Sequence, residues 1–282
     1  MAVKIVTDST SDISADLAGE LGITVVPLTV MFGRQTYLDR IEITTDEFYR
    51  RLSEEDIFPT TTQPSSGAFA EVYAKLLQDS DEILVLVISG KLSGAYQSAV
   101  SAIALAGGEG RIEVIDSRST AMGLGLLAIA AARLASQPGA CLSTVSQVMR
   151  EKIVCSQVAM IFDTLKYLAK GGRIGKAQGL LGSMLQVKPV LTVKDGEVSP
   201  LARLRSMSAG SEYLYNFVKG FANIEELAVE HATTPEAAEA LAARLRLIYP
   251  DKHIYRSVVS PVLGTYMGPN VLSVSVLSGK CV

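Results

Sequence analysis

Hydrophobic and polar positions divide the chain into short apolar runs, each followed by a turn rich in Ser, Thr and Gly. The clearest example is the apolar run from Ile83 to Ile88, which leads through a turn of small residues into an Ala-rich segment. This pattern predicts a buried parallel strand, a turn and a helix. The start of such a helix presents unpaired N–H groups and the positive end of its dipole, and Ser93 adds a hydroxyl donor. We therefore expect an anion-binding turn here.

Three further segments have a similar character. A strand from Val3 to Val6 runs into the hydroxyl-rich segment 7–12, and a strand over 111–115 ends in an Asp-Ser pair. The loop 58–67 holds three threonines between two prolines, which fix its backbone. Ligands of open α/β sheets bind outside the carboxyl ends of the strands, where these turns are expected to gather. The sequence thus predicts a single binding site formed by several turns, each of which alone is only a weak indication of one.

The order of the elements predicts an α/β fold with two domains. Strands and helices alternate over residues 1–152, including a strand from Thr24 to Met31 around Pro27, which predicts a three-layer α/β/α domain with a mostly parallel sheet. A strand over 157–162 opens a smaller α/β domain, residues 153–282, with a mixed sheet. The carboxyl-terminal domain is expected to contribute to the binding pocket.

Composition narrows the class of protein. The 282 residues carry a net charge of -3 with mixed signs, which argues against nucleic acid as a partner. The amino terminus lacks the pattern of a signal peptide. The apolar, uncharged run from Ser119 to Ala132 is shorter than the about 20 apolar residues that cross a bilayer. We therefore expect a soluble, cytoplasmic protein.

The sequence contains no pattern typical of a metal-binding or cofactor-binding site. His231 and His253 do not have the spacing of a histidine metal site. Cys141, Cys155 and Cys281 are odd in number and widely spaced, which predicts three reduced thiols and neither a disulfide framework nor a metal site. No phosphate loop or dinucleotide fingerprint is present. The prediction is a protein without metal or cofactor.

A serine nucleophile remains an alternative. Ser93 does not stand in a GxSxG elbow, but the fold could bring His231 and Asp116 near it, so an esterase or acyltransferase stays open. The hydroxyl groups could instead bind an anion without catalysis. With aliphatic residues around them, they suit an amphiphile with one charged end, such as a fatty acid, and a sugar phosphate is the weaker alternative.

Taken together, these segments resemble the DegV family of bacterial fatty-acid-binding proteins, also called FakB. The resemblance covers essentially the whole chain. The segments that carry it are Thr7–Asp12, Thr61–Ser65, Lys91–Ala99, Asp116–Ser117, Leu168–Ile174, Lys188–Pro189 and Gly264–Thr265.

The resemblance implies a protein that performs no chemistry itself but buries one long-chain fatty acid. The carboxylate is then held by Thr61 or Thr62 and by Ser93. A separate kinase, related to dihydroxyacetone kinases, phosphorylates it with ATP to an acyl phosphate for phospholipid synthesis. Arg173, which follows two glycines, and Arg205 are implied to face the kinase or the phosphate. Acyl exchange implies transient membrane contact.

Two positions depart from the family pattern. Where the family usually has Gly-Thr-His-Thr-Gly-Pro-Gly, this chain has Gly264–Asn270, so Tyr266 replaces the His that helps to bind the carboxylate. Tyr266 can donate one hydrogen bond but cannot become cationic near neutral pH. Thr62 replaces the commoner Ser and keeps the hydroxyl. Ser93 and Tyr266 are thus the expected partners of the carboxylate together with a threonine.

Overall fold

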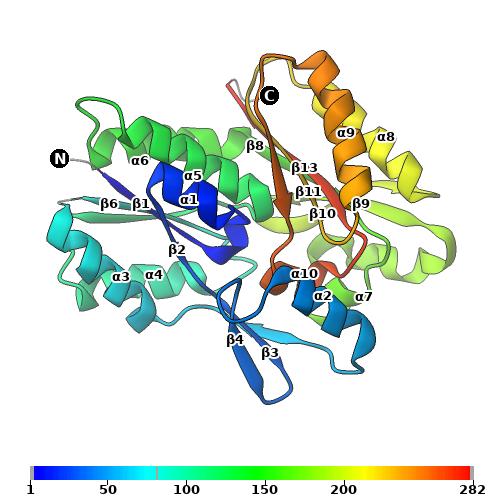
Figure 1. Cartoon of the computed structure of the whole chain (residues 1–282), viewed down its shortest axis with the longest axis horizontal. Helices are drawn as coiled ribbons and strands as arrows, with labels where there is room; N and C mark the ends of the chain where they lie inside the picture. Colours follow the sequence, from blue (N-terminus) through cyan, green and yellow to red (C-terminus); the bar gives the residue numbers. More distant parts are fainter. Residues whose placement is uncertain (1–2, 81, 280–282) are drawn as a thin grey trace.

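A four-stranded parallel sheet forms the core of the amino-terminal lobe (Figure 1). The computed structural model describes residues 3–80 and 82–279. The strand order is β2-β1-β6-β7. The strands are β1 (Lys4–Asp8), β2 (Ile23–Val26), β6 (Ile83–Val87) and β7 (Ile112–Asp116). All five residues of β6 are fully buried, which confirms the strand predicted from its apolar run.

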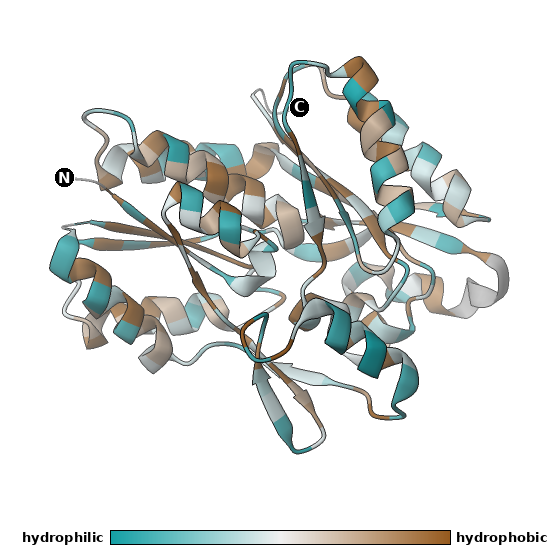
Figure 2. Ribbon diagram, viewed as in Figure 1, coloured by the Kyte–Doolittle hydropathy of each residue, from teal (hydrophilic) through white to brown (hydrophobic). Residues whose placement is uncertain are grey.

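Helices cover both faces of this sheet, as the alternating pattern predicts. One face carries α1 (Ala15–Leu21), α5 (Ala121–Ala135) and α6 (Leu142–Lys152). The opposite face carries α3 (Ser66–Asp79) and α4 (Ala95–Leu105), whose Phe69, Tyr73 and Ala99 pack on the sheet. The lobe is therefore a three-layer α/β/α structure, and its strands and α5 are mostly hydrophobic in Figure 2.

The carboxyl-terminal lobe is built on a mixed sheet with the order β10-β9-β8-β13-β11-β12. Only β11 and β12 are parallel to one another. The strands are β8 (Ser156–Ile161), β9 (Lys188–Lys194), β10 (Glu197–Leu204), β11 (Ile224–His231), β12 (Ile254–Val258) and β13 (Leu272–Ser278). Helices α8 (Met207–Lys219) and α9 (Pro235–Ile248) cover one face. The predicted mixed sheet is confirmed.

Helix α5 joins the two lobes. It packs on β1 and β6 of the parallel sheet and also on β8, β11 and β13 of the mixed sheet. Twelve of its fifteen residues are buried. At Gly125 an added Cβ would lie 2.4 Å from the carbonyl oxygen of Ser11, so a glycine is required for this close approach. Because one helix belongs to the core of both sheets, the domain boundary at residues 152 and 153 stays a prediction.

A small antiparallel sheet with the order β4-β3-β5 lies beside both lobes, and the sequence did not predict it. The expected single strand over 24–31 is two strands, because Pro27 has no N–H for a ladder and lies between them. The strands of this sheet are β3 (Thr29–Phe32), β4 (Gln35–Leu38) and β5 (Thr60–Thr62). The part of the predicted loop at 60–62 is therefore a strand.

Shorter helices connect these parts. Helix α10 contacts α2, α7, β3 and β5, so it links the carboxyl-terminal lobe to the small sheet. The helices are α2 (Thr45–Glu54), α7 (Lys166–Lys170) and α10 (Pro261–Met267). The 3-10 helices are η1 (Ser9–Ser11), η2 (Ile153–Cys155) and η3 (Gly175–Gln186). Across the described ranges, none of the helices is both long and apolar enough to cross a bilayer.

The expectation of three reduced thiols is wrong for Cys155, which is disulfide-bonded. Cys281 lies outside the described residues, while Cys141 is free. Antiparallel pairing of β8 with β13 brings Ser156 opposite Leu277, so the start of β8 lies beside the end of β13. Spacing along the sequence does not reveal such a neighbourhood.

Buried carboxyl groups connect the lobes close to α5. Asp12 accepts hydrogen bonds from Arg40 Nη2 (3.0 Å) and from the N–H of Ser260 (3.2 Å). Burial and the neighbouring Glu230 carboxyl of β11 raise the pKa of Asp12 well above its ordinary range. Asp39 accepts from Ser9 Oγ (2.6 Å), and burial raises its pKa to about 7. One arginine faces three carboxyl groups, so protons must neutralise part of the charge.

We expect Asp39 to make the free energy of unfolding depend on pH. Between its ordinary pKa of 3.8 and about 7, the folded protein retains a proton that the unfolded chain has lost, so stability falls as pH rises through this window. One such proton gives a slope of up to about 1.4 kcal/mol per pH unit. Asp39→Asn should remove this part of the slope in urea denaturation between pH 4 and 8. The exposed Asp251→Asn is the control, and an unchanged slope in Asp39→Asn would contradict the assignment.

Candidate functional site

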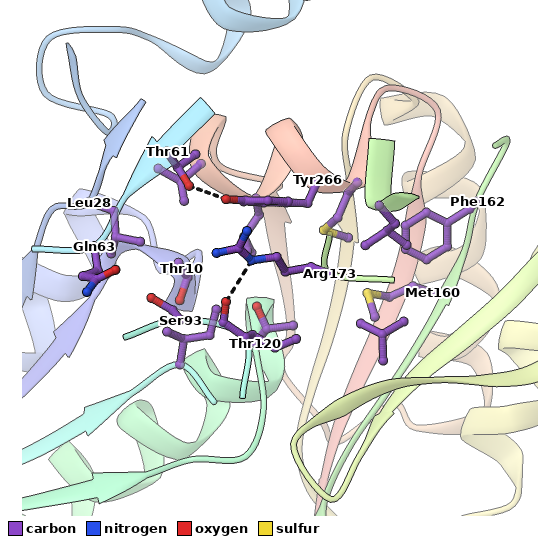
Figure 3. A pocket seen from close by; sticks show the side chains of 17 residues that line it. Thr10, Leu28, Thr61, Gln63, Ser93, Thr120, Met160, Phe162, Arg173 and Tyr266 are labelled. Carbon is purple, nitrogen blue, oxygen red and sulfur yellow. Dashed lines mark hydrogen bonds between the residues drawn. The ribbon is translucent and has the colours of Figure 1, made fainter. Parts of the chain in front are cut away.

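A cavity opens where the carboxyl ends of the parallel strands face the mixed sheet and α10 (Figure 3). Seventeen residues line it, and most of them are apolar. The apolar residues are Leu28, Ile88, Leu92, Met160, Phe162, Leu168, Val198, Val262, Leu263 and Met267. The remaining residues are Thr10, Thr61, Gln63, Ser93, Thr120, Arg173 and Tyr266. In Figure 3 these polar side chains lie toward one end, away from Met160 and Phe162.

Two side chains from distant segments close the polar end. Thr61 Oγ1 of β5 and Tyr266 Oη of α10 are hydrogen-bonded at 2.5 Å. The guanidinium of Arg173 lies over the ring of Tyr266, 5.1 Å from its centroid. Arg173 also donates to the carbonyl oxygens of Leu92 (3.3 Å) and Gly171 (2.8 Å). A cation and two hydroxyl groups are thus held together at the rim of the cavity.

The turn after β6 positions Ser93 as predicted. The backbone N–H of Ser93 donates to the carbonyl of Ser89 (3.1 Å), and its Oγ accepts from the N–H of Ala95 (3.2 Å) at the start of α4. Because the backbone uses a lone pair of the hydroxyl oxygen, the O–H proton stays available for a ligand. Ser93 is therefore oriented as a donor.

The two glycines after α7 leave space for the ring of Tyr266. An added Cβ at Gly171 would lie 2.4 Å from Cδ1 of Tyr266, so the ring fits only against a glycine. Gly172 has a positive φ of 71°, and the next N–H, that of Arg173, returns to the carbonyl of Leu168 (3.1 Å). The glycines turn the chain so that Arg173 lies over the ring.

Four of the six predicted residues meet in the cavity, namely Thr61, Ser93, Arg173 and Tyr266. Thr62 is exposed and does not line the cavity, because successive residues of β5 point to opposite faces. Arg205 is exposed after the end of β10 and lines no part of the cavity. Of the two threonines left open by the sequence, the structure brings Thr61 to the site.

Sequence reasoning did not single out three polar residues of the cavity. Thr10 lies in the hydroxyl-rich turn after β1, which the pattern had marked only as a segment. Gln63 follows β5, and Thr120 comes three residues after the Asp-Ser pair of β7. For Thr10 and Thr120, position after a strand of the parallel sheet was thus a usable signal, whereas Gln63 follows an antiparallel strand. The direction in which each side chain points could not be predicted from the sequence.

The Ser93 hydrolase alternative lacks its partners. The lining residues include no His, Asp, Glu or Lys, so within the described chain no general base faces the hydroxyl. His231 lies in a different hollow with Asp12 and Arg256. Asp116 accepts from the N–H of Arg118 (2.8 Å) and does not line the cavity. The geometry favours hydrogen bonding over nucleophilic attack.

A hollow on the surface adjoins the polar end. Thr61, Arg173 and Tyr266 line both the hollow and the cavity, so these three side chains separate them. On the outer side, Lys170 Nζ lies 4.3 Å from the centroid of the Phe58 ring. Any ligand group bound at the polar end of the cavity is therefore close to a basic surface.

Fold and site together define a two-lobed α/β protein with an apolar internal cavity that ends in hydroxyl groups and an arginine. The chain belongs to the DegV family, whose model, described as an uncharacterised protein of that family, matches residues 2–279. A DegV domain-containing protein of Caldanaerobacter subterraneus is 37% identical over 276 residues, 96% of this chain and 97% of that protein. The resemblance noted in the sequence is thereby confirmed.

Solved structures of a family member and of another fatty acid-binding protein share the whole fold. A fatty acid-binding DegV family protein from Thermus thermophilus has a TM-score of 0.89 and 34% identity, over 99% of this chain and 100% of its own. A stearic acid-binding protein from Eubacterium ventriosum has a TM-score of 0.85 and 26% identity, over 98% of each chain. These similarities confirm the predicted α/β fold.

We expect the Thr61–Tyr266 hydrogen bond to stabilise the unliganded protein. Thr61→Val and Tyr266→Phe should each lower the free energy of unfolding by about 0.5–1.5 kcal/mol, and the double variant by less than the sum, because one bond is lost in all three. Urea denaturation measures the free energy of unfolding of the parent protein, the two single variants and the double variant. Thr61→Val combined with Tyr249→Phe, whose hydroxyl donates to Val218 instead, should be additive. Additivity in the first pair would show that the bond contributes nothing.

Proposed function

We propose that this protein binds one long-chain fatty acid, with the acyl chain along the apolar part of the cavity and the carboxylate at its polar end. The observation that carries the proposal is the convergence of Ser93, Thr61, Tyr266 and Arg173 at one end of an otherwise apolar space. A fatty acid has this distribution of polarity. The likeness to a fatty acid-binding member of the family and to a stearic acid-binding protein supports the same ligand.

The charges at the site suit a carboxylate. A buried carboxylate needs hydrogen bonds and an opposite charge to replace its water. Arg173 supplies the positive charge, and the hydroxyls of Ser93 and Tyr266 supply neutral donors. Where the family resemblance implies a histidine, this chain has Tyr266, whose phenol has no cationic form, so Arg173 alone among the lining residues supplies a positive charge to pair with the carboxylate.

The proposal continues to a carrier that does no chemistry itself. A separate fatty acid kinase, of the dihydroxyacetone-kinase-like type, phosphorylates the bound carboxylate with ATP to an acyl phosphate for phospholipid synthesis. The adjoining hollow supports this, because only Thr61, Arg173 and Tyr266 stand between its basic surface and the cavity. Use of ATP places the protein in the cytoplasm, and exchange of the acyl chain involves transient contact with the membrane.

The identity of the ligand can be tested directly. The purified protein is extracted with organic solvent, and the extract is analysed by mass spectrometry before and after incubation with a mixture of fatty acids. We expect one equivalent of long-chain fatty acid. Extracts without fatty acid after incubation, together with thermal stabilisation by sugar phosphates, would transfer support to the sugar-phosphate alternative.

Ser93→Ala should weaken fatty acid binding by about 1.5–3 kcal/mol, because it removes a hydrogen bond to a charged group. Isothermal titration with palmitate or stearate measures the change. Ser101, which is exposed on α4, the helix that follows Ser93, provides the control Ser101→Ala, and the affinity of this variant should equal that of the parent protein. Equal affinity in Ser93→Ala would remove Ser93 from the site.

Arg205 distinguishes contact with the kinase from contact with the ligand. Because Arg205 is exposed and outside the cavity, Arg205→Ala should retain fatty acid affinity and lower the rate of phosphorylation about tenfold, the effect of one lost charge-assisted bond. Arg173→Ala should lower both the affinity for fatty acid and the rate of phosphorylation, since Arg173 lines the cavity and the hollow. ATP consumption measures the rate of phosphorylation, and calorimetric titration measures the affinity for fatty acid. Arg246→Ala on the exposed side of α9 is the control. An unchanged rate in Arg205→Ala would exclude it from the partner surface.

A further inference from the structure

Thr120 places an unused hydroxyl in the cavity. The residue is 5% exposed, and its Oγ1 is enclosed without a hydrogen-bond partner within the described chain. Thr120 lines the cavity, and Figure 3 shows its side chain at the same end as Ser93. A buried hydroxyl left unpaired costs about 1–3 kcal/mol, so an unpaired one that faces a cavity calls for a ligand.

The local backbone holds this hydroxyl away from its usual partner. Thr120 is the N-cap of α5, where a threonine ordinarily accepts a hydrogen bond from its own helix, but it makes no such bond. The next residue, Ala121, is fully buried with a positive φ of 53°, a strained conformation for a residue with a Cβ. The carbonyl of Ser119 accepts from the N–H of Ser89 (2.9 Å), which ties this turn to the turn after β6.

Thr10, the other threonine of this side, cannot take the same role. Its Oγ1 donates to Asp8 Oδ1 at 2.5 Å, so it presents only lone pairs to the cavity. In the pair of Thr61 and Tyr266, one of two hydroxyl protons is used between them and one remains free. Ser93 has a free proton because its oxygen accepts from Ala95.

The other donors at this end leave room for Thr120. A carboxylate has two oxygens with about four lone-pair sites. The available donors include the hydroxyl of Ser93, one hydroxyl of the Thr61–Tyr266 pair, Nη2 of Arg173, whose Nε and Nη1 donate to backbone carbonyls, and the side-chain amide of Gln63. Among the lining residues that the structure describes, Thr120 is the one whose buried hydroxyl has no partner, so it gains most from an acceptor in the cavity.

We propose that Thr120 donates a hydrogen bond to the carboxylate of the bound fatty acid. The assignment rests on the proposed function and adds a binding residue to it. It is consistent with the strained turn before α5, where the hydroxyl of Thr120 makes no cap bond to the helix and the residue lines the cavity. The helix that joins the two lobes thus begins at the ligand.

Thr120→Val, which keeps the shape and removes the hydroxyl, tests the proposal. We expect stearate affinity to fall about tenfold or more and the unliganded protein to be as stable as the parent or more stable, because an unpaired polar group is gone. Thr120→Ser should retain most of the affinity. Thr120→Ala is a second hydroxyl-free variant should Thr120→Val fail to fold.

Thr7 offers a matched control. It is fully buried on β1, its Oγ1 also has no partner within the described residues, and it does not line the cavity. Thr7→Val should change stability in the same direction as Thr120→Val and leave stearate affinity unaltered. Loss of affinity in both variants would mean that any change in buried polarity disturbs the site, and the proposal would be wrong.

The choice of ligand separates the remaining outcomes. The affinity loss in Thr120→Val should be present with stearate and small with octadecanol, which lacks the carboxylate. If Thr120→Val lost affinity only for a fatty acid with a hydroxyl group on its acyl chain, Thr120 would lie beside the acyl chain and not beside the carboxylate. That result would overturn the proposal. Unchanged stearate affinity in Thr120→Val, with the expected loss in Ser93→Ala, would overturn the role of Thr120 alone. A parent protein that binds no fatty acid would instead overturn the proposed function.

Discussion

Burial of α5 between the parallel and the mixed sheet is the constraint on which the rest of the structure depends. Twelve of its fifteen residues are buried, and it contacts strands of both lobes. Small residues allow this: at Gly125 the backbone of η1 leaves no space for a Cβ. The helix sets the position of one sheet against the other, and the carboxyl ends of the parallel strands face the carboxyl-terminal lobe as a consequence. The cavity lies at this junction.

Segments that are far apart in the chain complete the cavity because α10 and the small sheet meet beside it. Thr61 and Tyr266 are separated by 205 positions, yet their hydroxyls share a hydrogen bond. Arg173 lies over the same ring, and Gly171 provides the space for it. The polar end of the cavity is therefore a product of three parts of the fold, while its apolar part belongs to the packed interior.

Near the same junction the protein buries Asp12, Asp39 and Glu230 with a single arginine, Arg40, close to them. Burial raises the pKa of each carboxyl, so protonation replaces the missing positive charges. Hydrogen bonds from the N–H groups of Ser260 and Val262 connect this group to the start of α10. The interface between the lobes is thus specified by polar contacts as well as by apolar packing.

The sequence by itself determined most strands and helices of the two lobes and the chemistry of the turns that follow the parallel strands. Apolar runs such as Ile83–Val87 are local, and so are the hydroxyl-rich turns behind them, which is why the α/β fold, Ser93 and the family could be recognised. Only the tertiary structure decided which side chains meet. It brought Thr61 and Thr120 to the cavity and left Thr62 outside it, placed Arg173 over the ring of Tyr266 and joined Cys155 in a disulfide. Periodicity reports the face of an element, whereas contacts between distant segments depend on how whole elements pack.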